Sequence, residues 1–403
     1  MTVIIGIVGK PSAGKSTFLN AACLTNAKTS EIPFTTITPN RGVAYVKTLC
    51  VCKELKVKDN PKNSFCLNGI RFIPINLLDV AGLVPDAHKG KGLGNQFLND
   101  LSQADVLIHI VDVSGSLDKM GKRIGEGKND PLEDILFLEN EIDLWFKQII
   151  ERQDWNKFLK SFLRQKGKIV DELYNRLSGV KVKKVDILKA IQISGLDKKN
   201  PSSWTEDDVL NFSKKLREFS KPILIVANKI DKEISKENFE KLKERYKGAL
   251  IPCSSLAEYY LRKYEKERII DYIPGSNDFS ILQPEKLTQK ELEALHNIKE
   301  KILNYYGSTG VQDALNFAVF NLAKQICVYP VADLNTYSDN NNNVLPDAIL
   351  IDEGTKLKEF VKEKIHSDLA KKFMFGIDAR TKKRLSEDYE LKNNDVIKVV
   401  VSK

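Results

Sequence analysis

The segment Gly9-Lys10-Pro11-Ser12-Ala13-Gly14-Lys15-Ser16 decides the fold of this chain. It matches the pattern G-x-x-x-x-G-K-[ST], follows the apolar run 3–8 and precedes the helical spacing of 17–22. A glycine-rich turn between a buried strand and a helix directs backbone N–H groups inward, where they form a concave anion site. A plain glycine turn is the alternative, and the flanking elements argue against it. The sequence therefore predicts a phosphate-binding loop.

This loop predicts roles for its own residues. Lys15 is expected to reach the β- and γ-phosphates of a nucleotide and to act in catalysis, and the Ser16 hydroxyl is expected to hold Mg²⁺. The predicted nucleotide-binding residues of the loop are Gly9, Pro11, Ser12, Ala13, Gly14, Lys15, Ser16 and Thr17.

A second motif, Asp79-Val80-Ala81-Gly82, follows the apolar run 75–78. A carboxylate at a strand end beside the phosphate loop can orient Mg²⁺ through a water, so Asp79 is predicted as a metal residue. The backbone N–H of Gly82 can meet the γ-phosphate without a side chain in the way. Taken alone, the four residues would also suit an ordinary turn.

A third motif, Asn228-Lys229-Ile230-Asp231, follows the buried strand predicted at 222–227. The Asp231 carboxylate can accept hydrogen bonds from the ring N1–H and the exocyclic amino group of guanine, which adenine does not offer. Alone, this motif would also suit a solvated turn. Because all three motifs follow predicted parallel strands in the order expected of a GTPase, we predict an α/β P-loop GTPase domain that binds GTP and GDP through Asn228, Lys229 and Asp231.

With these motifs, the chain resembles the Obg-related GTPases, and within them the YchF-like branch that carries a C-terminal TGS domain. Segment 32–40 resembles the switch I of that family, and segment 79–98 resembles its glycine-rich switch II. Segments 307–310 and 328–331 resemble the approach to its TGS domain. The resemblance covers essentially the whole chain.

The resemblance implies further site residues. Thr36, with Thr35 as the second choice, would close over Mg²⁺ and the γ-phosphate as both a metal residue and a catalytic residue. Gly82 would act beside it in catalysis. Ser254 and Ser255 would belong to the last guanine-contacting loop, although two serines after a strand are also common in plain turns.

Two residues depart from patterns found among GTPases. Leu83 stands where many GTPases have a glutamine that orients the attacking water, which implies slow hydrolysis or help from another group or a partner. Ser12 stands where potassium-activated relatives have an asparagine that helps to coordinate K⁺, so potassium as a cofactor is placed in question. YchF-like proteins include members that prefer ATP, and the intact Asp231 favours GTP here.

The pattern of apolar runs predicts three parts. The GTPase domain is expected at 1–114 and 221–325, interrupted by a helical hairpin domain at 115–220. From 326 to 403, short β runs surround one amphipathic helix, which indicates a β-grasp plan that resembles a TGS domain.

Composition suggests a partner and a compartment. The chain of 403 residues carries a formal net charge of +9, which favours RNA or the ribosome as a polyanionic partner; surface lysines that serve only solubility are the alternative. A basic cluster in the last part comprises Lys371, Lys372, Arg380, Lys382, Lys383 and Arg384. Val3 already begins a core strand, and no apolar run reaches membrane-spanning length, so we expect a cytoplasmic protein that binds no membrane.

The six cysteines suggest no metal or disulfide framework. Cys50-Val51-Cys52 has the spacing of neither a zinc ribbon nor a thioredoxin-like pair, so small buried side chains are the simpler interpretation. The sequence as a whole predicts a monomeric, Mg²⁺-dependent, GTP-hydrolysing switch that associates with the ribosome or RNA. The alternatives are an ATPase of the same fold and a nucleotide-gated RNA-binding scaffold with negligible turnover.

Overall fold

The computed structural model describes residues 3–24, 41–80, 93–151, 155, 157–159, 162 and 169–402. The chain folds into two compact units. The larger unit comprises Ile4–Ala21 and Leu77–Ala314, and the smaller unit comprises Met1–Val3, Ala22–Asn76 and Leu315–Lys403. Within the described residues, no helix combines the length and the apolar composition that crossing a membrane requires.

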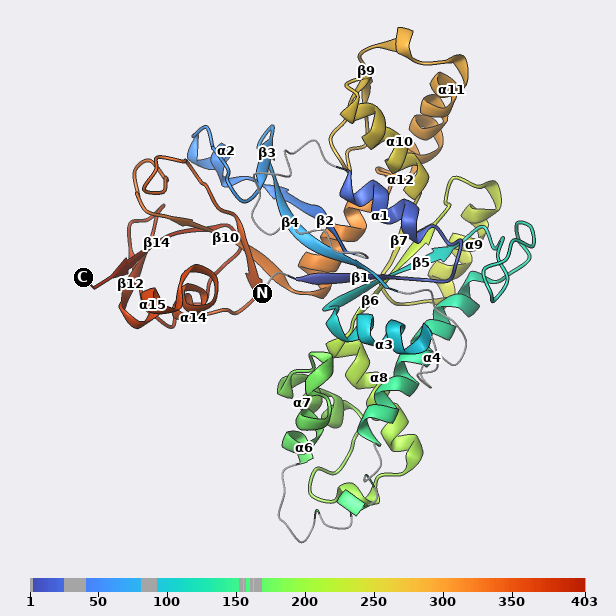
Figure 1. Ribbon diagram of the computed structural model, residues 1–403, viewed down its shortest axis with the longest axis horizontal. Helices are drawn as coiled ribbons and strands as arrows, with labels where there is room; N and C mark the ends of the chain where they lie inside the picture. Colours follow the sequence, from blue (N-terminus) through green and yellow to red (C-terminus); the bar gives the residue numbers. More distant parts are fainter. Residues whose placement is uncertain are drawn as a thin grey trace. The chain divides into compact units, whose positions relative to one another are not determined.

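The larger unit is built on a mainly parallel sheet with the strand order β4-β1-β5-β6-β7 (Figure 1). Its strands are β1 (Ile4–Val8), β4 (Ile70–Asp79), β5 (Val106–Asp112), β6 (Ile223–Asn228) and β7 (Leu250–Cys253). β1, β5, β6 and β7 pair in parallel, with Asp112 opposite Asn228 and Asn228 opposite Cys253. The carboxyl ends of these strands therefore meet at one edge, where all the predicted motifs begin.

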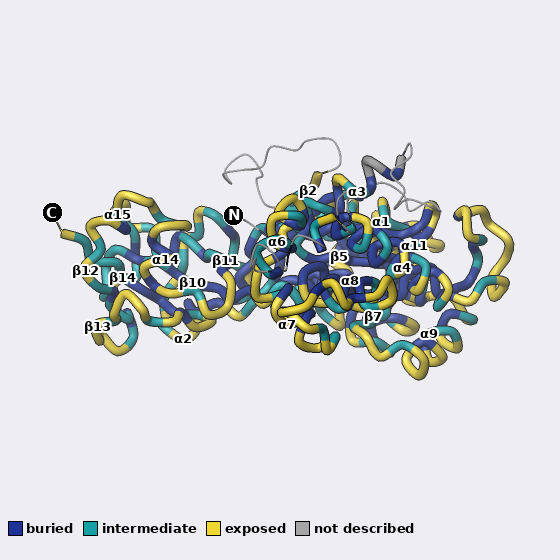
Figure 2. The backbone as a smooth tube through the Cα atoms, turned by 90° about the horizontal axis from the view of Figure 1, so that it is seen from below, coloured by how far each residue is buried: buried dark blue, intermediate teal, exposed yellow. Residues whose placement is uncertain are grey.

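Helices flank this sheet, and the first of them begins at the helical spacing predicted after the phosphate loop. They are α1 (Lys15–Cys23), α3 (Leu93–Gln103), α9 (Glu233–Arg245) and α10 (Ser255–Lys266). β5 and β6 are buried along their whole length, as the dark tube of β5 in Figure 2 shows. Continuous apolar runs are typical of strands covered on both faces.

The insertion between β5 and β6 is helical. Its helices are α4 (Pro131–Ile150), α6 (Ile169–Arg176), α7 (Lys184–Ile193) and α8 (Glu206–Ser220), with 3-10 turns at Ser178–Val180 and Pro201–Ser203. Asp130 caps α4 by accepting a hydrogen bond from Leu132 N, and a capping box of Thr205 and Asp208 starts α8. Arg217 of α8 and Asp143 of α4 form a buried ion pair at 3.0 Å.

A further part of the larger unit packs around α10. It contains β8 (Ile270–Asp271), β9 (Ser280–Ile281), a 3-10 turn (Pro284–Lys286), α11 (Gln289–Ile298), a π-helical turn (Lys299–Leu303), α12 (Asn304–Tyr306) and α13 (Val311–Asn316). The sequence does not predict the β8–β9 ribbon, because two-residue strands leave no periodic pattern.

The smaller unit contains a five-stranded sheet with the order β11-β10-β14-β12-β13. Its elements are β10 (Gln325–Val331), β11 (Ile349–Asp352), α14 (Leu357–Phe360), a π-helical turn (Val361–Ile365), α15 (Ser367–Lys371), β12 (Phe373–Asp378), β13 (Arg384–Leu385) and β14 (Asp395–Val401). Leu357 and Phe360 of α14 are buried in the core of this sheet, and the β-grasp prediction is confirmed.

The same unit also contains β2 (Arg41–Leu49), α2 (Val51–Leu55), β3 (Phe65–Leu67), the first part of β4, and a π-helical turn at Phe317–Leu322. β3 pairs antiparallel with β4, and the rings of Phe65 and Phe72 stack at 4.8 Å. The α/β fold with a P-loop GTPase sheet, helical content and a terminal β-grasp sheet agrees with the predicted fold class.

Candidate functional site

The predicted phosphate loop connects β1 to α1. Gly9 and Gly14 have φ angles of 145° and 105°, which favour glycine. A Cβ on Gly9 would press against the carbonyl oxygen of Ile110, and one on Gly14 would overlap Nδ2 of Asn228. Pro11 and Ser12 are exposed, whereas Ala13 is buried beneath them. The loop is therefore tightly seated on β5 and β6, with its outer turn accessible to a ligand.

Lys15 lies across this loop. Its Nζ donates hydrogen bonds to the carbonyl oxygens of Gly9 at 2.7 Å and Lys10 at 3.3 Å. Burial lowers the pKa of Lys15, and the negative charge of Asp79 acts in the opposite direction. The ammonium group is thus held at the loop, close to the end of β4.

The predicted metal residues occupy the neighbouring positions. Asp79 is the last residue of β4 and is half-buried; burial raises its pKa, Lys15 lowers it and Asp100 raises it further. The hydroxyl-bearing Ser16 is exposed in the first turn of α1, and Thr17 follows it. Thr36 and Gly82 lie outside the described residues, and so do Thr35 and Leu83.

The two most distant motifs meet at Asn228. Its Nδ2 donates to the carbonyl oxygen of Ala13 at 2.9 Å. Its Oδ1 accepts from the backbone N–H of Ser255 at 3.0 Å and from the Ser255 hydroxyl at 2.9 Å. One buried amide therefore ties the phosphate loop to the start of α10.

Asp231 is positioned by a serine from the same segment. The Ser254 hydroxyl donates to Oδ1 of Asp231 at 2.8 Å and also caps α10 by accepting from Ala257 N. The structure therefore brings together Asn228, Asp231, Ser254 and Ser255, as the sequence and the family resemblance predict. This hydrogen bond orients the Asp231 carboxylate.

Lys229 has an ion-pair partner that its motif does not predict. Its Nζ forms an ion pair with Oδ2 of Asp112 at 3.0 Å. Burial alone would raise the pKa of Asp112, but hydrogen bonds from Ser114, Ser116 and Lys229 outweigh it and lower the pKa. A carboxylate at the carboxyl end of a buried strand is the only sequence signal for this partner.

The segment after α12 is a second missed contributor. The backbone N–H of Ser254 donates to the carbonyl oxygen of Thr309 at 2.9 Å. Gly310 has a φ of 86°, and a Cβ there would overlap the carbonyl oxygen of Pro252. The resemblance places 307–310 only on the approach to the TGS domain, whereas the structure also packs it against the loop that carries Ser254.

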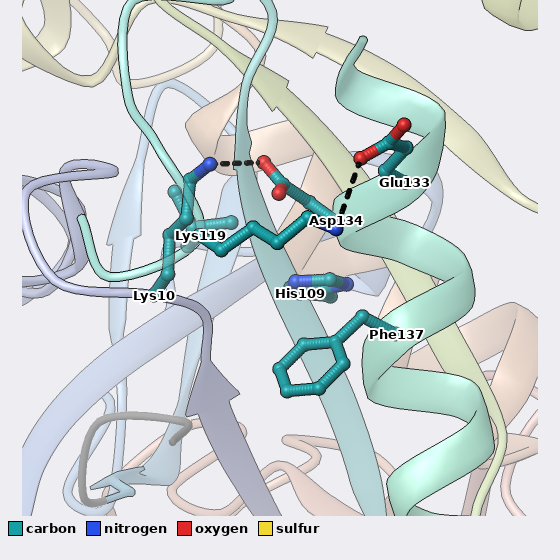
Figure 3. Close-up of a pocket in the computed structure, with 7 residues that line it drawn as sticks. Lys10, His109, Lys119, Glu133, Asp134 and Phe137 are labelled. Carbon is teal, nitrogen blue, oxygen red and sulfur yellow. Dashed lines mark ion pairs between the residues drawn. The ribbon is translucent and has the colours of Figure 1, made fainter. Parts of the chain in front are cut away.

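A small cavity lies beside the phosphate loop (Figure 3). It has a volume of about 110 Å³, and its lining residues are Lys10, His109, Ile110, Lys119, Glu133, Asp134 and Phe137. Lys10 Nζ forms a buried ion pair with Asp134 of α4 at 2.7 Å and donates to the carbonyl oxygen of Leu117 at 3.1 Å. Ligand pockets typically measure about 300–1,000 Å³, so this cavity is too small for a nucleotide. The contacts of Lys10 with Asp134 and Leu117 instead attach the phosphate loop to α4 and to the segment after β5.

Comparison with known proteins agrees with this geometry. Three family models match the chain: a 50S ribosome-binding GTPase at residues 4–141, the G4 motif-containing domain of YGR210-like Obg-like GTPases at 226–333, and a TGS domain at 342–401. A GTP-binding protein of Methanocaldococcus jannaschii is 46% identical over 398 residues, which are 98% of this chain and 98% of that protein. This chain belongs to the Obg-like GTPases of the YGR210-like, YchF type.

Other relatives support the same family. A GTP-binding protein of Schizosaccharomyces pombe is 36% identical over 364 residues, 88% of each chain. The human protein named Obg-like ATPase 1 is 30% identical over 298 residues, 69% of this chain and 68% of that protein. The crystal structure of a GTP-binding protein from Pyrococcus horikoshii has a TM-score of 0.77 and 38% identity, covering 99% of this chain and all of that one. The family predicted from the motifs is confirmed.

Replacing His109 should make this Obg-like GTPase less sensitive to acid. Burial and the positive charges of Lys15 and Lys10 lower the pKa of His109 to about 3, against about 6.5 in the unfolded chain. The neutral imidazole therefore contributes stability that is complete above pH 6.5 and is lost as the pH falls toward 3. Between pH 7 and pH 5, the wild type should lose about 2 kcal/mol more of its free energy of unfolding than His109→Asn.

Denaturant unfolding of both proteins at the two pH values measures this difference. Comparing the change with pH, and not the absolute stability, removes the cost of the substitution itself. An equal loss in both proteins would contradict a lowered pKa for His109 in the folded state.

Proposed function

We propose that this chain binds GTP and hydrolyses it to GDP and phosphate in a Mg²⁺-dependent reaction. The observation that carries the proposal is the Asn228 amide, which joins the phosphate loop at Ala13 to the start of α10 at Ser255. Through this link, one buried side chain would hold the proposed phosphate site and the proposed base site at a fixed separation. Such a span suits a nucleoside triphosphate held at both ends.

The base end is proposed to select guanine. Asp231 would accept two hydrogen bonds from the base, with Ser254 holding its carboxylate in place. Asn228 and Lys229 would line the same site, with Lys229 fixed by Asp112. A carboxylate left without donors by adenine would disfavour ATP.

The phosphate end is proposed to use the backbone of Gly9, Ser12, Ala13 and Gly14, flanked by Pro11 and Thr17. Lys15 would exchange its two carbonyl partners for the β- and γ-phosphate oxygens, which carry full negative charge. Positioning and charge compensation account for most catalysis of phosphoryl transfer, so Lys15 would be catalytic. Thr36 and Gly82 would complete the catalytic site.

The donor set fits Mg²⁺, which prefers oxygen ligands. Ser16 would supply a hydroxyl, Thr36 a second hydroxyl, and Asp79 a carboxylate acting through water. The charge of a divalent cation would offset the burial that raises the pKa of Asp79. When bound, Mg²⁺ neutralises charge on the β- and γ-phosphate oxygens.

The proposed output is nucleotide-dependent binding of the monomer to the ribosome or to RNA. Several cations of the terminal basic cluster already have partners. Arg380 pairs with Glu54, Lys371 pairs with Asp368 at 3.0 Å, and Lys382 donates to a backbone carbonyl. Exposed cations of the cluster with no carboxylate partner among the described residues are Lys372, Lys383 and Arg384. These three are the residues proposed to contact phosphates.

Changing Lys372, Lys383 and Arg384 together to glutamine should flatten the salt dependence of RNA binding. Each phosphate contact contributes roughly 0.7 to the slope of log K against log salt for a single strand, so a loss of about two units is expected. Fluorescence anisotropy with ribosomal RNA over a series of salt concentrations measures the slope. Lys371→Gln is the matched control, because Lys371 already forms an ion pair with Asp368 and is not among the residues proposed to contact phosphates. An unchanged slope in the triple variant would remove this surface from RNA binding.

ATP is the second candidate substrate, because several relatives are named Obg-like ATPase 1. Titration of GTP, GDP and ATP against the purified chain, followed by phosphate release, separates the two. Repeating the titration in potassium and in sodium salts reports on the cofactor role of K⁺ that Ser12 leaves open. A chain that binds GTP with no turnover, with or without ribosomes, would be a nucleotide-gated scaffold.

A further inference from the structure

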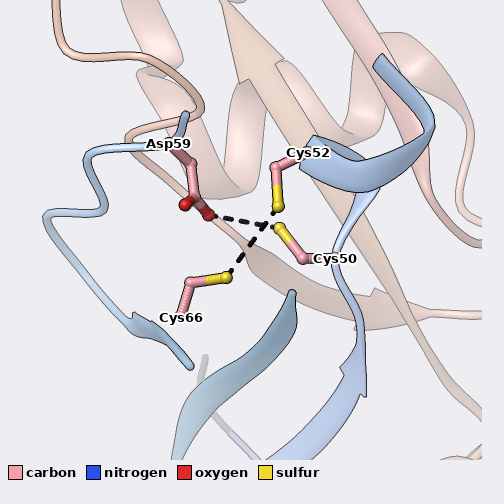
Figure 4. Close-up of side chains that lie close together, drawn as sticks. All are labelled: Cys50, Cys52, Asp59 and Cys66. Carbon is pink, nitrogen blue, oxygen red and sulfur yellow. Dashed lines mark hydrogen bonds between the residues drawn. The ribbon is translucent and has the colours of Figure 1, made fainter. Parts of the chain in front are cut away.

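Four side chains of metal-binding type converge in the smaller unit (Figure 4). Cys50 precedes α2, Cys52 lies in its first turn, Asp59 lies in the following loop, and Cys66 lies in β3. Their three Sγ atoms and one carboxylate oxygen all lie within 4.8 Å of one another. The sequence alone indicates only small buried side chains at Cys50 and Cys52, because the other two residues join them through the fold.

Two distances within this cluster lie close to the edges of a tetrahedral zinc site, and the others are at most 4.8 Å. Zn–S bonds of about 2.3 Å predict a sulfur–sulfur edge of about 3.8 Å, and a Zn–O bond of about 2.1 Å predicts a sulfur–oxygen edge of about 3.6 Å. Sγ of Cys52 lies 3.9 Å from Sγ of Cys66, and Sγ of Cys50 lies 3.3 Å from Oδ2 of Asp59. An ion at the centre would change these two distances by only about 0.1 Å and about 0.3 Å.

We propose that Cys50, Cys52, Asp59 and Cys66 bind one zinc ion. Three thiolates favour zinc over the harder Mg²⁺ and Ca²⁺. All four ligands come from the protein, which is typical of a structural site and leaves no open position for catalysis. Binding would displace the thiol protons, including the one that Cys50 now directs at Asp59.

Backbone contacts hold the ligands in place without a metal. Cys50 N donates to the carbonyl oxygen of Gly69 at 2.9 Å, and Val57 N donates to that of Cys52 at 3.0 Å. Cys66 pairs with Arg71 across the β3–β4 ladder. The ligand positions are therefore largely formed in advance, which lowers the ordering cost of binding.

The buried Arg71 supplies charge compensation. Its Nη1 lies 3.4 Å from Oδ2 of Asp59, and its side chain is fully buried. Three thiolates and one carboxylate carry four negative charges, and zinc neutralises two of them. The guanidinium neutralises a third and orients the carboxylate, as partners outside the ligand set commonly do.

The site would stabilise the contact between the loop after α2 and the segment before β11. Asn60 N donates to the carbonyl oxygen of Val344 and Lys62 N to that of Pro346, both at 2.8 Å. Asn63 exchanges two hydrogen bonds with Ala348, at 3.0 and 3.1 Å. Asp59 immediately precedes residues 60–63, which form these contacts. A zinc ion bound to Asp59 would therefore hold the first residues of this segment in place.

Elemental analysis of the full chain tests the proposal. The chain is expressed with zinc in the medium, purified with a phosphine reductant and no chelator, and analysed by mass spectrometry for metals. We expect about one zinc ion per chain. Cys52→Ala and Cys66→Ala should lose it, and Asp59→Asn should weaken zinc affinity by at least about 10-fold. Cys23→Ala is the matched control, since this half-buried cysteine lies in the same unit and outside the cluster.

Cobalt titration of the wild-type chain covers the case in which the variants do not fold. After removal of zinc, Co²⁺ should give thiolate-to-metal charge-transfer bands and the intense visible bands of tetrahedral coordination. Hydrogen exchange at 60–63 should slow on adding zinc, while exchange in β5 and β6 stays unchanged. A reduced chain that takes up no zinc at 10-fold molar excess, an octahedral cobalt spectrum, or full zinc in Cys66→Ala would each overturn the proposal. So would a Cys52–Cys66 disulfide in place of metal.

Discussion

Asp231→Asn should weaken GTP binding by a factor on the order of 10⁴ and raise the affinity for xanthosine triphosphate. Guanine offers two donors to the Asp231 carboxylate, and an asparagine amide presents a donor to one of them. Xanthine carries a carbonyl in place of the amino group, so the amide suits it. Competition binding with fluorescent GTP and xanthosine triphosphate analogues measures both changes.

Ser254→Ala is the matched control for this switch. It removes the hydrogen bond that orients the Asp231 carboxylate and leaves the carboxylate itself in place. We expect a loss of about 1 kcal/mol, or roughly fivefold in GTP affinity, without a gain for xanthine. Equal binding of ATP and GTP by the wild type would contradict guanine selection by Asp231.

Lys15→Ala should reduce the rate of GTP hydrolysis by about 10³-fold or more. The Lys15 ammonium is held against the loop by the carbonyl oxygen of Gly9, where the proposed reaction would place the phosphate oxygens that gain charge as the bond breaks. Alanine would leave that charge without the Lys15 ammonium. Single-turnover phosphate release at saturating GTP isolates the chemical step from product release.

Two variants that should have much smaller effects on the rate of GTP hydrolysis serve as controls for Lys15→Ala. Lys119→Ala removes an exposed lysine near the same loop, which among the described residues pairs with Glu133 at 3.9 Å, and it should leave the rate within about twofold. Leu83→Ala removes no hydrogen bond to water and should also change the rate far less than Lys15→Ala. Hydrolysis by Lys15→Ala at the wild-type rate would exclude Lys15 from catalysis.

Most of the candidate nucleotide site could be predicted from local sequence. The phosphate loop needs glycine at Gly9 and Gly14 because the close backbone contacts there exclude a Cβ. Asn228 and Asp231 follow a strand whose apolar run is unmistakable, since both faces of β6 are buried. Such motifs are readable because the chemistry and the geometry lie within a few consecutive residues.

The helices of the insertion were also predictable in part. α7 and α8 lie within the segment 115–220 that is predicted to be helical. Between α4 and α7, the structure describes mainly α6 (Ile169–Arg176), so the predicted hairpin is described there only in part. The short β3 and the β8–β9 ribbon were not predictable, because a strand of two or three residues shows no periodicity.

The sequence by itself determined the fold family, the order of the three motifs and the identity of the residues that would meet the phosphates and the base. Only the tertiary structure decided the partners of those residues: Asp112 for Lys229, Thr309 for Ser254 and Asp134 for Lys10. It also gathered Asp59 and Cys66 around Cys50-Val51-Cys52. These contacts join different elements, so they depend on strand order and register, and no local pattern of residues encodes them.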